Sequence, residues 1–153
     1  MLCLYSCHKG CDIISTLTVP AKIESLYLVQ DFIEQQLQSY SCDEQLIMPI
    51  NLAAEEIFVN IVQYGFSNTN DKNVIIINCF IENSSIFYLQ FCDMGVPFNP
   101  LQKQIPLIDA SIEERSIGGL GIYLAKKLMD GITYEFTNGK NKLTLKKSLV
   151  LPK

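Results

Sequence analysis

The sequence predicts an α+β fold: a two-layer α/β sandwich in which three helices cover one face of a mixed, mostly antiparallel sheet. Two observations lead to it: apolar residues recur at helical spacing in three segments, and strand-like segments come in pairs joined by short polar turns. The apolar face of such a sheet needs a cover, which the helices supply. The 153 residues, 48% of them hydrophobic, suffice for one core. We expect a loose leader at residues 1–11 and a single domain at residues 12–153.

The first half of the domain predicts one strand and two helices. Residues 13–19 are rich in β-branched side chains and form a strand that stops at Pro20. Pro20 suits the opening of a helix, where its missing N–H costs nothing. Apolar residues then recur at helical spacing over residues 26–37, and again over residues 43–64. Pro49 falls early in this second helix and marks either a kink or its true start.

The middle of the chain predicts a hairpin followed by a long connection. Residues 74–81 and 86–92 are strand-like, and the polar segment Glu82–Ser85 between them is typical of a turn. Residues 95–119 have no clear period and include three prolines. Because ordinary connections in compact domains are shorter, this segment is typical of a lid.

The end of the chain predicts a helix and a closing hairpin. Residues 120–129 have helical spacing, and two strand-like segments follow at residues 132–137 and 143–149. Asn138-Gly139 between them is a strong hairpin signal.

Charge and apolar patterning limit the partners of the chain. The net charge is −4 and the basic residues form no tract, which argues against direct nucleic-acid binding. We expect no membrane span, because no apolar run approaches the roughly 20 residues that a span needs. The first residues lack the basic region of a signal peptide. Together these features predict a cytoplasmic protein.

Three cysteines near the N-terminus are spaced four residues apart. Cys3, Cys7 and Cys11 have His8 among them, so a Cys3His metal site is one interpretation. Structural zinc sites usually have two close pairs separated by a longer loop. The spacing therefore favours a leader without a metal, and the role of these four residues stays open.

The second predicted helix carries a carboxylate and an amide on one face. Glu56 and Asn60 are one turn apart, and Ala53 leaves room beside them. Oxygen atoms of these two groups can hold a hydrated Mg²⁺ and orient a hydroxyl group. The alternative is the exposed polar face of an amphipathic helix.

An acidic residue follows the second strand of the first hairpin. Asp93 there can accept a hydrogen bond from an exocyclic amine such as that of adenine. Gly95 would let the backbone approach a flat ring. The alternative is an ordinary turn, since aspartate and glycine are common turn residues.

Three glycines precede or open the third helix. Gly118, Gly119 and Gly121 suit a polyphosphate, because backbone N–H groups and a helix N-terminus favour anions. No Lys-Ser/Thr follows, so this is not a Walker A loop, and no βαβ unit precedes it as a Rossmann fingerprint requires. The alternative is a flexible hinge.

The order and spacing of these motifs resemble the Bergerat-type ATP site. That site is shared by the GHKL families: gyrases, histidine kinases, mismatch-repair ATPases and large heat-shock chaperones. From about Leu17 to Lys147 the chain resembles small bacterial anti-sigma factor kinases of the RsbW and SpoIIAB type. The segments that carry the resemblance are Leu52–Tyr64, Asp93–Pro100, Gly118–Asp130 and Asn138–Lys146.

The resemblance implies roles for residues on the second helix and on the sheet. Glu56 would be the general base, and Asn60 would ligate Mg²⁺. Asp93 would bind the adenine amine, with Gly95 close to the ring. Thr144 matches a position that helps the aspartate hold adenine.

It also implies roles for the lid and the glycine loop. Gly118, Gly119 and Gly121 would cradle the phosphates of ATP, and Arg115 is a candidate for the γ-phosphate. Pro97 departs from the wider superfamily, which often has a glycine there. Because of this departure, the sequence does not fix the position of the lid hinge.

The implied reaction is phosphoryl transfer from ATP, with Mg²⁺, to a serine or threonine of a small, STAS-type anti-sigma factor antagonist. A sigma factor is the other implied partner, and homodimers are frequent in this branch. Two alternatives stay open. One is a binding module in which ATP shapes a partner surface without phosphoryl transfer, and the other is a nucleotide-free interaction domain.

Overall fold

The structure is a computed structural model that describes residues 3–5, 14–68, 72–102 and 120–150. Pairs of strands and three helices follow one another along these residues, as the periodicity predicts. In chain order the elements are β1 Cys3–Tyr5, β2 Ile14–Pro20, the short 3-10 helix η1 Ile23–Ser25, α1 Leu26–Ser39, α2 Glu44–Tyr64, β3 Val74–Glu82, β4 Ile86–Asp93, the 3-10 helix η2 Pro100–Gln102, α3 Leu120–Leu128, β5 Gly131–Thr137 and β6 Lys140–Ser148.

The strands form one six-stranded sheet in the order β1-β2-β3-β4-β6-β5. Every strand pairing in the described residues is antiparallel, whereas a mixed, mostly antiparallel sheet was expected. The connection from β2 to β3 explains part of this difference. It contains two helices rather than one, so the chain re-enters the sheet in the opposite direction.

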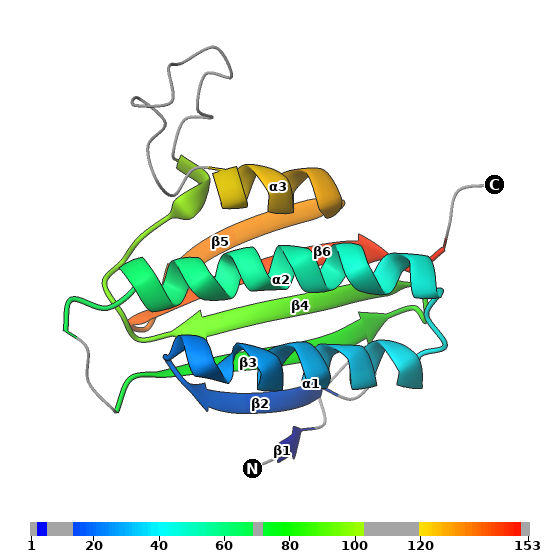
Figure 1. Ribbon diagram of the computed structural model, residues 1–153, viewed down its shortest axis with the longest axis horizontal. Coiled ribbons are helices and arrows are strands. Elements are labelled where there is room, and N and C mark those ends of the chain that lie inside the picture. Colours follow the sequence, from blue (N-terminus) through cyan, green and yellow to red (C-terminus); the bar gives the residue numbers. More distant parts are fainter. Residues whose placement is uncertain (1–2, 6–13, 69–71, 103–119, 151–153) are drawn as a thin grey trace.

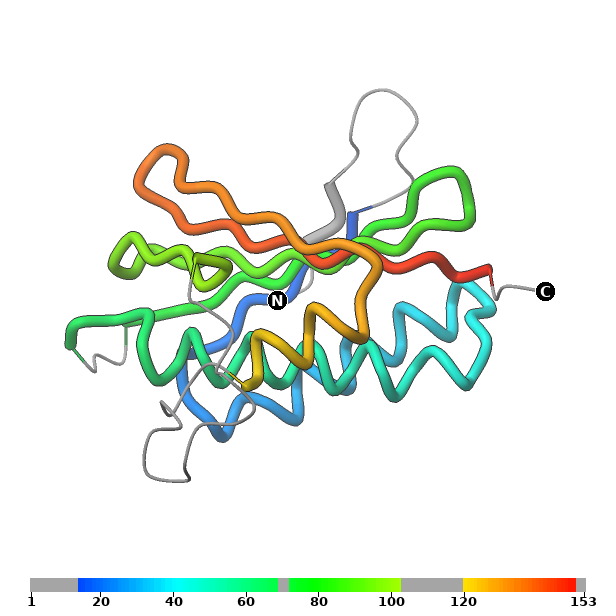
Figure 2. Tube along the Cα trace, turned by 90° about the horizontal axis from the view of Figure 1, so that it is seen from above, coloured from blue at the N-terminus to red at the C-terminus, as the bar shows by residue number. Residues whose placement is uncertain are grey.

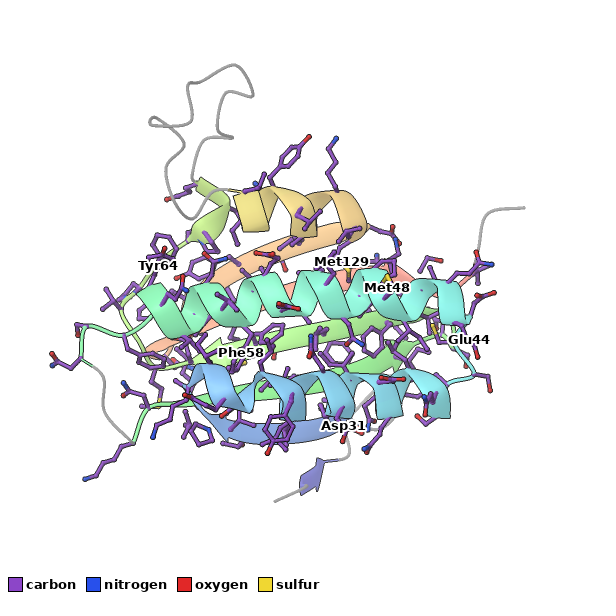
Figure 3. The ribbon with its side chains drawn as sticks, in the orientation of Figure 1. Asp31, Glu44, Met48, Phe58, Tyr64 and Met129 are labelled. Carbon is purple, nitrogen blue, oxygen red and sulfur yellow. The ribbon has the colours of Figure 1, made fainter. Side chains whose placement is uncertain are left out.

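The helices α1, α2 and α3 lie side by side on one face of the sheet (Figures 1 and 2). Burial along β4 follows the pleat: Phe87, Leu89 and Phe91 are buried beneath the helices, and the side chains between them point to the open face. Phe58 of the central helix α2 is fully buried in the same core (Figure 3). The predicted two-layer α+β sandwich is therefore confirmed.

Pro20 ends the predicted strand and Pro49 lies early inside the predicted second helix, but neither proline opens a helix. Pro20 is the last residue of β2 and does not open a helix, because η1 and α1 begin later. Pro49 marks no helix start: α2 begins at Glu44 and is capped by Asp43, whose side chain accepts a hydrogen bond of 2.9 Å from the N–H of Gln45.

The N-terminal leader is not wholly without structure, since Cys3–Tyr5 pairs with β2 as the strand β1. Cys7, His8 and Cys11 lie outside the described residues. Among the side chains that the structure describes, no group of three or more His, Cys, Asp or Glu is arranged to hold a metal ion.

The helix α2 is, among the described helices, the one long and apolar enough to cross a membrane, contrary to the expectation of no such run. Length and composition alone give this result, and core helices of soluble proteins pass the same test. Ile50, Ala54 and Ile57 of α2 are buried in the core against the sheet. Packing therefore accounts for the apolar residues on the face of α2 that covers the sheet.

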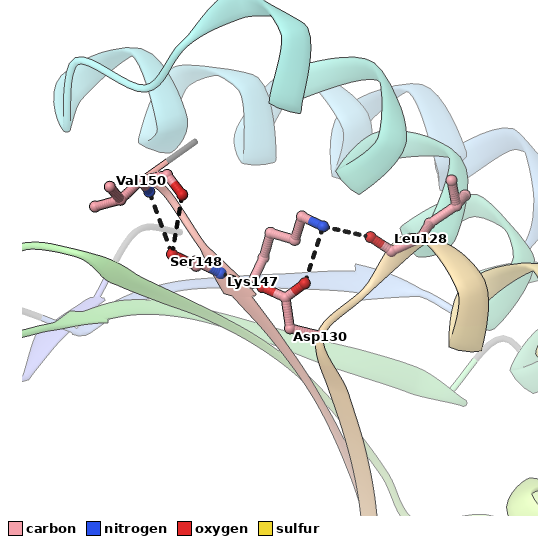
Figure 4. A network of polar contacts seen from close by, with 5 residues as sticks. All are labelled: Leu128, Asp130, Lys147, Ser148 and Val150. Carbon is pink, nitrogen blue, oxygen red and sulfur yellow. Dashed lines mark hydrogen bonds and ion pairs between the residues drawn. The ribbon is translucent and has the colours of Figure 1, made fainter. Parts of the chain in front are cut away.

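A polar network fixes the C-terminal end of α3 to β6 (Figure 4). The ammonium group of Lys147 donates to the carbonyl of Leu128 at 2.8 Å and to Asp130 at 3.1 Å, and the N–H of Ser148 donates to Asp130 at 2.6 Å. Burial raises the pKa of Asp130, but the bonds from Ser148 and Lys147 outweigh it and hold the pKa below its ordinary value. This network holds the C-terminal end of α3 against the sheet.

Candidate functional site

An open pocket of about 410 Å³ lies between α2, α3 and the ends of β4 and β6. Its walls are mostly apolar, and a few polar side chains converge on it, which is the usual make-up of a small-molecule site. Ile57, Ile61, Val96, Phe98, Pro100, Ile122 and Leu143 supply apolar walls, and Asn60, Asp93, Tyr134 and Asn141 supply polar groups.

Asp93 is the last residue of β4 and is only 6% exposed. Its Oδ1 atom accepts two hydrogen bonds of 2.8 Å, from the N–H of Gly95 and from the side-chain amide of Asn141. Within the described part of the chain, no donor reaches Oδ2. Burial raises the pKa of Asp93 above its ordinary value, and these two hydrogen bonds oppose that rise. The carboxylate is thus held by one oxygen and offers the other as an acceptor.

Asn141 of β6 is the partner that orients this carboxylate, and sequence reasoning missed it. It lies directly opposite Asp93 in the β4–β6 pairing and is 6% exposed. The side-chain amide donates to Asp93 and, at 3.1 Å, to the carbonyl of Val96. Its carbonyl oxygen accepts from the hydroxyl of Tyr134 at 2.6 Å and from the N–H of Phe98 at 3.3 Å.

Thr144, the residue expected to help Asp93, lies on the other face of the sheet. It pairs with Gln90, whose side-chain amide donates to the Thr144 hydroxyl at 3.0 Å, and it does not line the pocket. Leu143 and Leu145 on either side of it are buried beneath the helices. This alternation was the available signal: it places Asn141 with the leucines and Thr144 on the open face.

Gly95 is required by its own backbone surroundings. A Cβ atom there would lie 1.9 Å from the carbonyl oxygen of Gly65, at the C-terminal end of α2. The N–H of Val96 donates to that same carbonyl at 2.8 Å. Gly95 therefore lets the chain after β4 pack closely against α2, while its approach to a base ring stays a prediction.

Glu56 and Asn60 lie on the side of α2 that faces α3 and the pocket. The Asn60 side-chain amide donates to the backbone carbonyl of Glu56 at 2.6 Å, which leaves its Oδ1 atom for the pocket. The Glu56 carboxylate lies against α3: a Cβ atom on Gly121 would lie 2.0 Å from Glu56 Oε2. Among the described residues, no hydrogen bond reaches this carboxylate.

The glycine loop is described only in part. Gly121 is in the first turn of α3, as expected, whereas Arg115, Gly118 and Gly119 lie outside the described residues. The structure thus brings Glu56, Asn60, Asp93, Gly95 and Gly121 to one end of the molecule and adds Asn141 and Tyr134.

Residues 19–147 match the family described as the histidine kinase-like ATPase domain. The chain belongs to the histidine kinase-like ATPase family. Membership of this ATPase family, which is of the GHKL type, implies that the domain binds ATP. Family membership also agrees with the order in which Glu56, Asn60, Asp93 and Gly121 follow one another along the chain.

Relatives of this histidine kinase-like ATPase domain include a named kinase. The serine/threonine-protein kinase BtrW of Bordetella bronchiseptica is 26% identical over 101 residues, which are 66% of this chain and 70% of that protein. This similarity agrees with the resemblance to anti-sigma factor kinases.

Two solved structures share the fold. The RsbU and RsbW domains of Rv1364c from Mycobacterium tuberculosis match 88% of this chain with a TM-score of 0.63 and 17% identity, and the match spans 31% of that chain. The histidine kinase domain of the Erythrobacter litoralis EL346 blue-light activated histidine kinase matches 86% of this chain with a TM-score of 0.52 and 12% identity, and spans 62% of that chain. At these identities the likeness concerns the fold.

Proposed function

We propose that this ATPase domain binds Mg-ATP in the pocket and transfers the γ-phosphoryl group to a serine or threonine of a partner protein. The observation that carries the proposal is the Asp93 carboxylate, which lines the mostly apolar pocket: two donors hold its Oδ1 atom, and no donor of the described residues reaches Oδ2. A single acceptor in such surroundings fits the exocyclic amine of adenine.

The α2 side of the pocket would serve the phosphates. Asn60 would ligate Mg²⁺ through Oδ1, because its amide nitrogen is already bonded to the Glu56 carbonyl. Mg²⁺, when bound, would neutralise phosphate charge. The backbone N–H groups at the start of α3, beside Gly121, would bind phosphate oxygens together with Gly118, Gly119 and the candidate Arg115.

Glu56 would act on the acceptor hydroxyl. The hydroxyl oxygen forms a bond to the γ-phosphorus, the bond from that phosphorus to the bridging oxygen breaks, and ADP leaves. The hydroxyl proton passes to the Glu56 carboxylate, which has no hydrogen-bond partner among the described residues. Most of the rate enhancement would come from positioning and charge neutralisation.

The 26% identity with BtrW, a protein named as a serine/threonine kinase, supports a protein substrate. We propose a STAS-type anti-sigma factor antagonist as the phosphoryl acceptor and a sigma factor as a second partner, with homodimerisation as the assembly to test. This part of the proposal rests on the resemblance to the RsbW and SpoIIAB branch.

Two adjacent glutamates allow a matched experiment. Glu56 lies against α3, whereas the neighbouring Glu55 accepts a hydrogen bond of 3.1 Å from Gln30 of α1. Transfer from γ-labelled ATP to candidate antagonists should fall about 100-fold in Glu56→Gln, the lower end of the usual general-base effect. ATP affinity should stay within about threefold of wild type, and Glu55→Gln should behave as wild type.

Other outcomes separate the alternatives. Transfer that persists in Glu56→Gln would contradict the role of Glu56. Tight ATP binding without transfer to any partner would instead support a non-catalytic module that sequesters a sigma factor or other partner. Equilibrium dialysis that detects no Mg-ATP binding at millimolar concentrations would defeat the ATP site itself.

A further inference from the structure

We propose that Asn141 and Tyr134 form a clamp that makes recognition of the adenine amine depend on two residues that position Asp93. The clamp holds the Asp93 carboxylate in one orientation and ties it to the backbone of Val96 and Phe98. The inference rests on the proposed binding of adenine at Asp93 and deepens it.

The first step is that Asn141 has no capacity left for a ligand. An asparagine side chain can donate two hydrogen bonds and accept two through its carbonyl oxygen. Asn141 donates to Asp93 and to the Val96 carbonyl, and accepts from Tyr134 and the Phe98 N–H. A buried side chain with all four bonds made is a positioning residue, and it acts on a nucleotide only through Asp93.

The second step concerns the orientation of Asp93. Both of its donors, Gly95 N–H and the Asn141 amide, bind the same oxygen, Oδ1. Loss of the Asn141 bond would leave the carboxylate held by Gly95 alone and free to turn about its last torsion. Because buried polar networks gain rigidity only when all members are satisfied, the direction of Oδ2 depends on Asn141.

The third step links the carboxylate to the segment that follows it. The Tyr134 hydroxyl of β5 donates to Asn141 Oδ1 and also accepts from the Phe98 N–H at 3.2 Å. Val96 is held from the other side by the Gly65 carbonyl. The chain from Val96 to Phe98 is therefore fixed between α2 and the β5–β6 hairpin, and Tyr134 completes this fixation through one hydroxyl group.

Two nucleotides that differ only in the exocyclic amine, the group that Asp93 would bind, test the clamp. Purine riboside triphosphate is ATP without its exocyclic amine. Titration calorimetry with both nucleotides should show that the wild-type protein binds ATP at least tenfold more tightly. In Asn141→Ala this preference should fall to within about threefold, because ATP binding weakens while binding of purine riboside triphosphate changes by less than threefold.

Tyr134→Phe gives a milder variant, since it removes one hydroxyl and keeps the ring. We expect its preference for ATP over purine riboside triphosphate to be about threefold smaller than that of the wild-type protein. Tyr27→Phe is the matched control, because Tyr27 is 68% exposed on α1 and lies outside the pocket, and its preference should equal that of wild type. Thermal unfolding of each variant shows whether it folds.

The result that overturns the clamp is an equal weakening of both nucleotides in Asn141→Ala, because a purely structural role would affect them alike. If Asn141→Ala does not fold, Tyr134→Phe decides, and an unchanged ATP preference there overturns the clamp. A wild-type protein that binds both nucleotides equally would contradict the Asp93–amine contact, and the clamp would fall with it. Binding of neither nucleotide would contradict the proposed function itself.

Discussion

Both faces of the sheet carry a row of side-chain hydrogen bonds across neighbouring strands, but the two rows differ in charge and in what they border. On the helix-covered face, the buried Asp93 and Asn141 form a row with the half-buried Tyr134 beside the pocket. On the open face the row is neutral and half-buried, with bonds of 2.9, 3.2 and 3.0 Å in turn. Its members are Thr16, Asn78, Gln90 and Thr144.

The comparison of the two rows shows that burial and charge decide how much a side-chain hydrogen bond matters. A bond to a buried charge is stronger than one between neutral groups, and removal of its partner leaves a costly unsatisfied group. A half-buried neutral group can exchange its partner for water. We therefore expect substitutions at the Asp93 row to have large effects on ATP binding, and those on the open face to have small ones.

The largest effect is expected for Asp93→Ala. It removes the proposed acceptor of the adenine amine, and a hydrogen bond to a charged group is worth about 1.5–3 kcal/mol. ATP affinity should therefore fall roughly 10- to 150-fold by titration calorimetry. Asp31→Ala is a control on the exposed side of α1, where Asp31 contacts Gln35 (Figure 3). A change below threefold in Asp93→Ala would remove Asp93 from the ATP site.

The backbone beside this row should be almost as sensitive. Gly95→Ala places a Cβ atom 1.9 Å from the Gly65 carbonyl oxygen, so backbone must move, whereas the Cβ of Gly131→Ala meets only Lys146 at 3.6 Å. Overpacking of this kind typically costs about 1–3 kcal/mol. Urea unfolding should show that loss for Gly95→Ala and less than about 0.5 kcal/mol for Gly131→Ala. Equal stabilities would mean that the chain after β4 does not pack against α2 as described.

The pH dependence of ATP binding provides a third, smaller effect. Burial raises the pKa of Asp93 above the ordinary 3.8, and only the ionised carboxylate offers Oδ2 as a full acceptor. As pH falls through this raised pKa, ATP affinity should drop by up to about tenfold per pH unit, starting at a higher pH than for an ordinary aspartate.

The same pKa shift affects folding stability in the opposite direction to ATP affinity. Because the folded state raises this pKa, it favours the protonated form, so Asp93 costs stability as pH rises through that range. Asp93→Asn is the control, since it keeps the shape and cannot ionise, and it also corrects for protonation of the nucleotide. Parallel pH profiles for wild type and Asp93→Asn would contradict a role of the Asp93 charge.

Local pattern was sufficient for most of the fold. Helical spacing predicted α1, α2 and α3, and the Asn138-Gly139 signal predicted a turn in which both residues do have positive φ, 54° and 72°. The end of the first long strand at Pro20 was also foreseen. The antiparallel pairing of β2 with β3 was not, because it depends on how distant segments meet.

The sequence predicts which site residues lie close together only where they belong to the same helix or strand. Glu56 and Asn60 lie one turn apart on α2 whatever surrounds them. Contacts across strands need the register, and a difference of an odd number of residues puts two side chains on opposite faces. Asn141 and Thr144 differ by three, so one joins Asp93 and the other joins Gln90.

The smallest expected effect belongs to Thr144→Val on the open face. The change keeps the shape of the side chain and removes the hydroxyl that accepts from Gln90. Gln90 can then bond to water, so stability should fall by about 0.5–1 kcal/mol at most, and ATP affinity should stay within twofold. Urea unfolding and calorimetry measure both. A tenfold loss of ATP affinity would place Thr144 in the ATP site after all, and would require a β6 register shifted by an odd number of residues, which would carry Asn141 to the open face and away from Asp93.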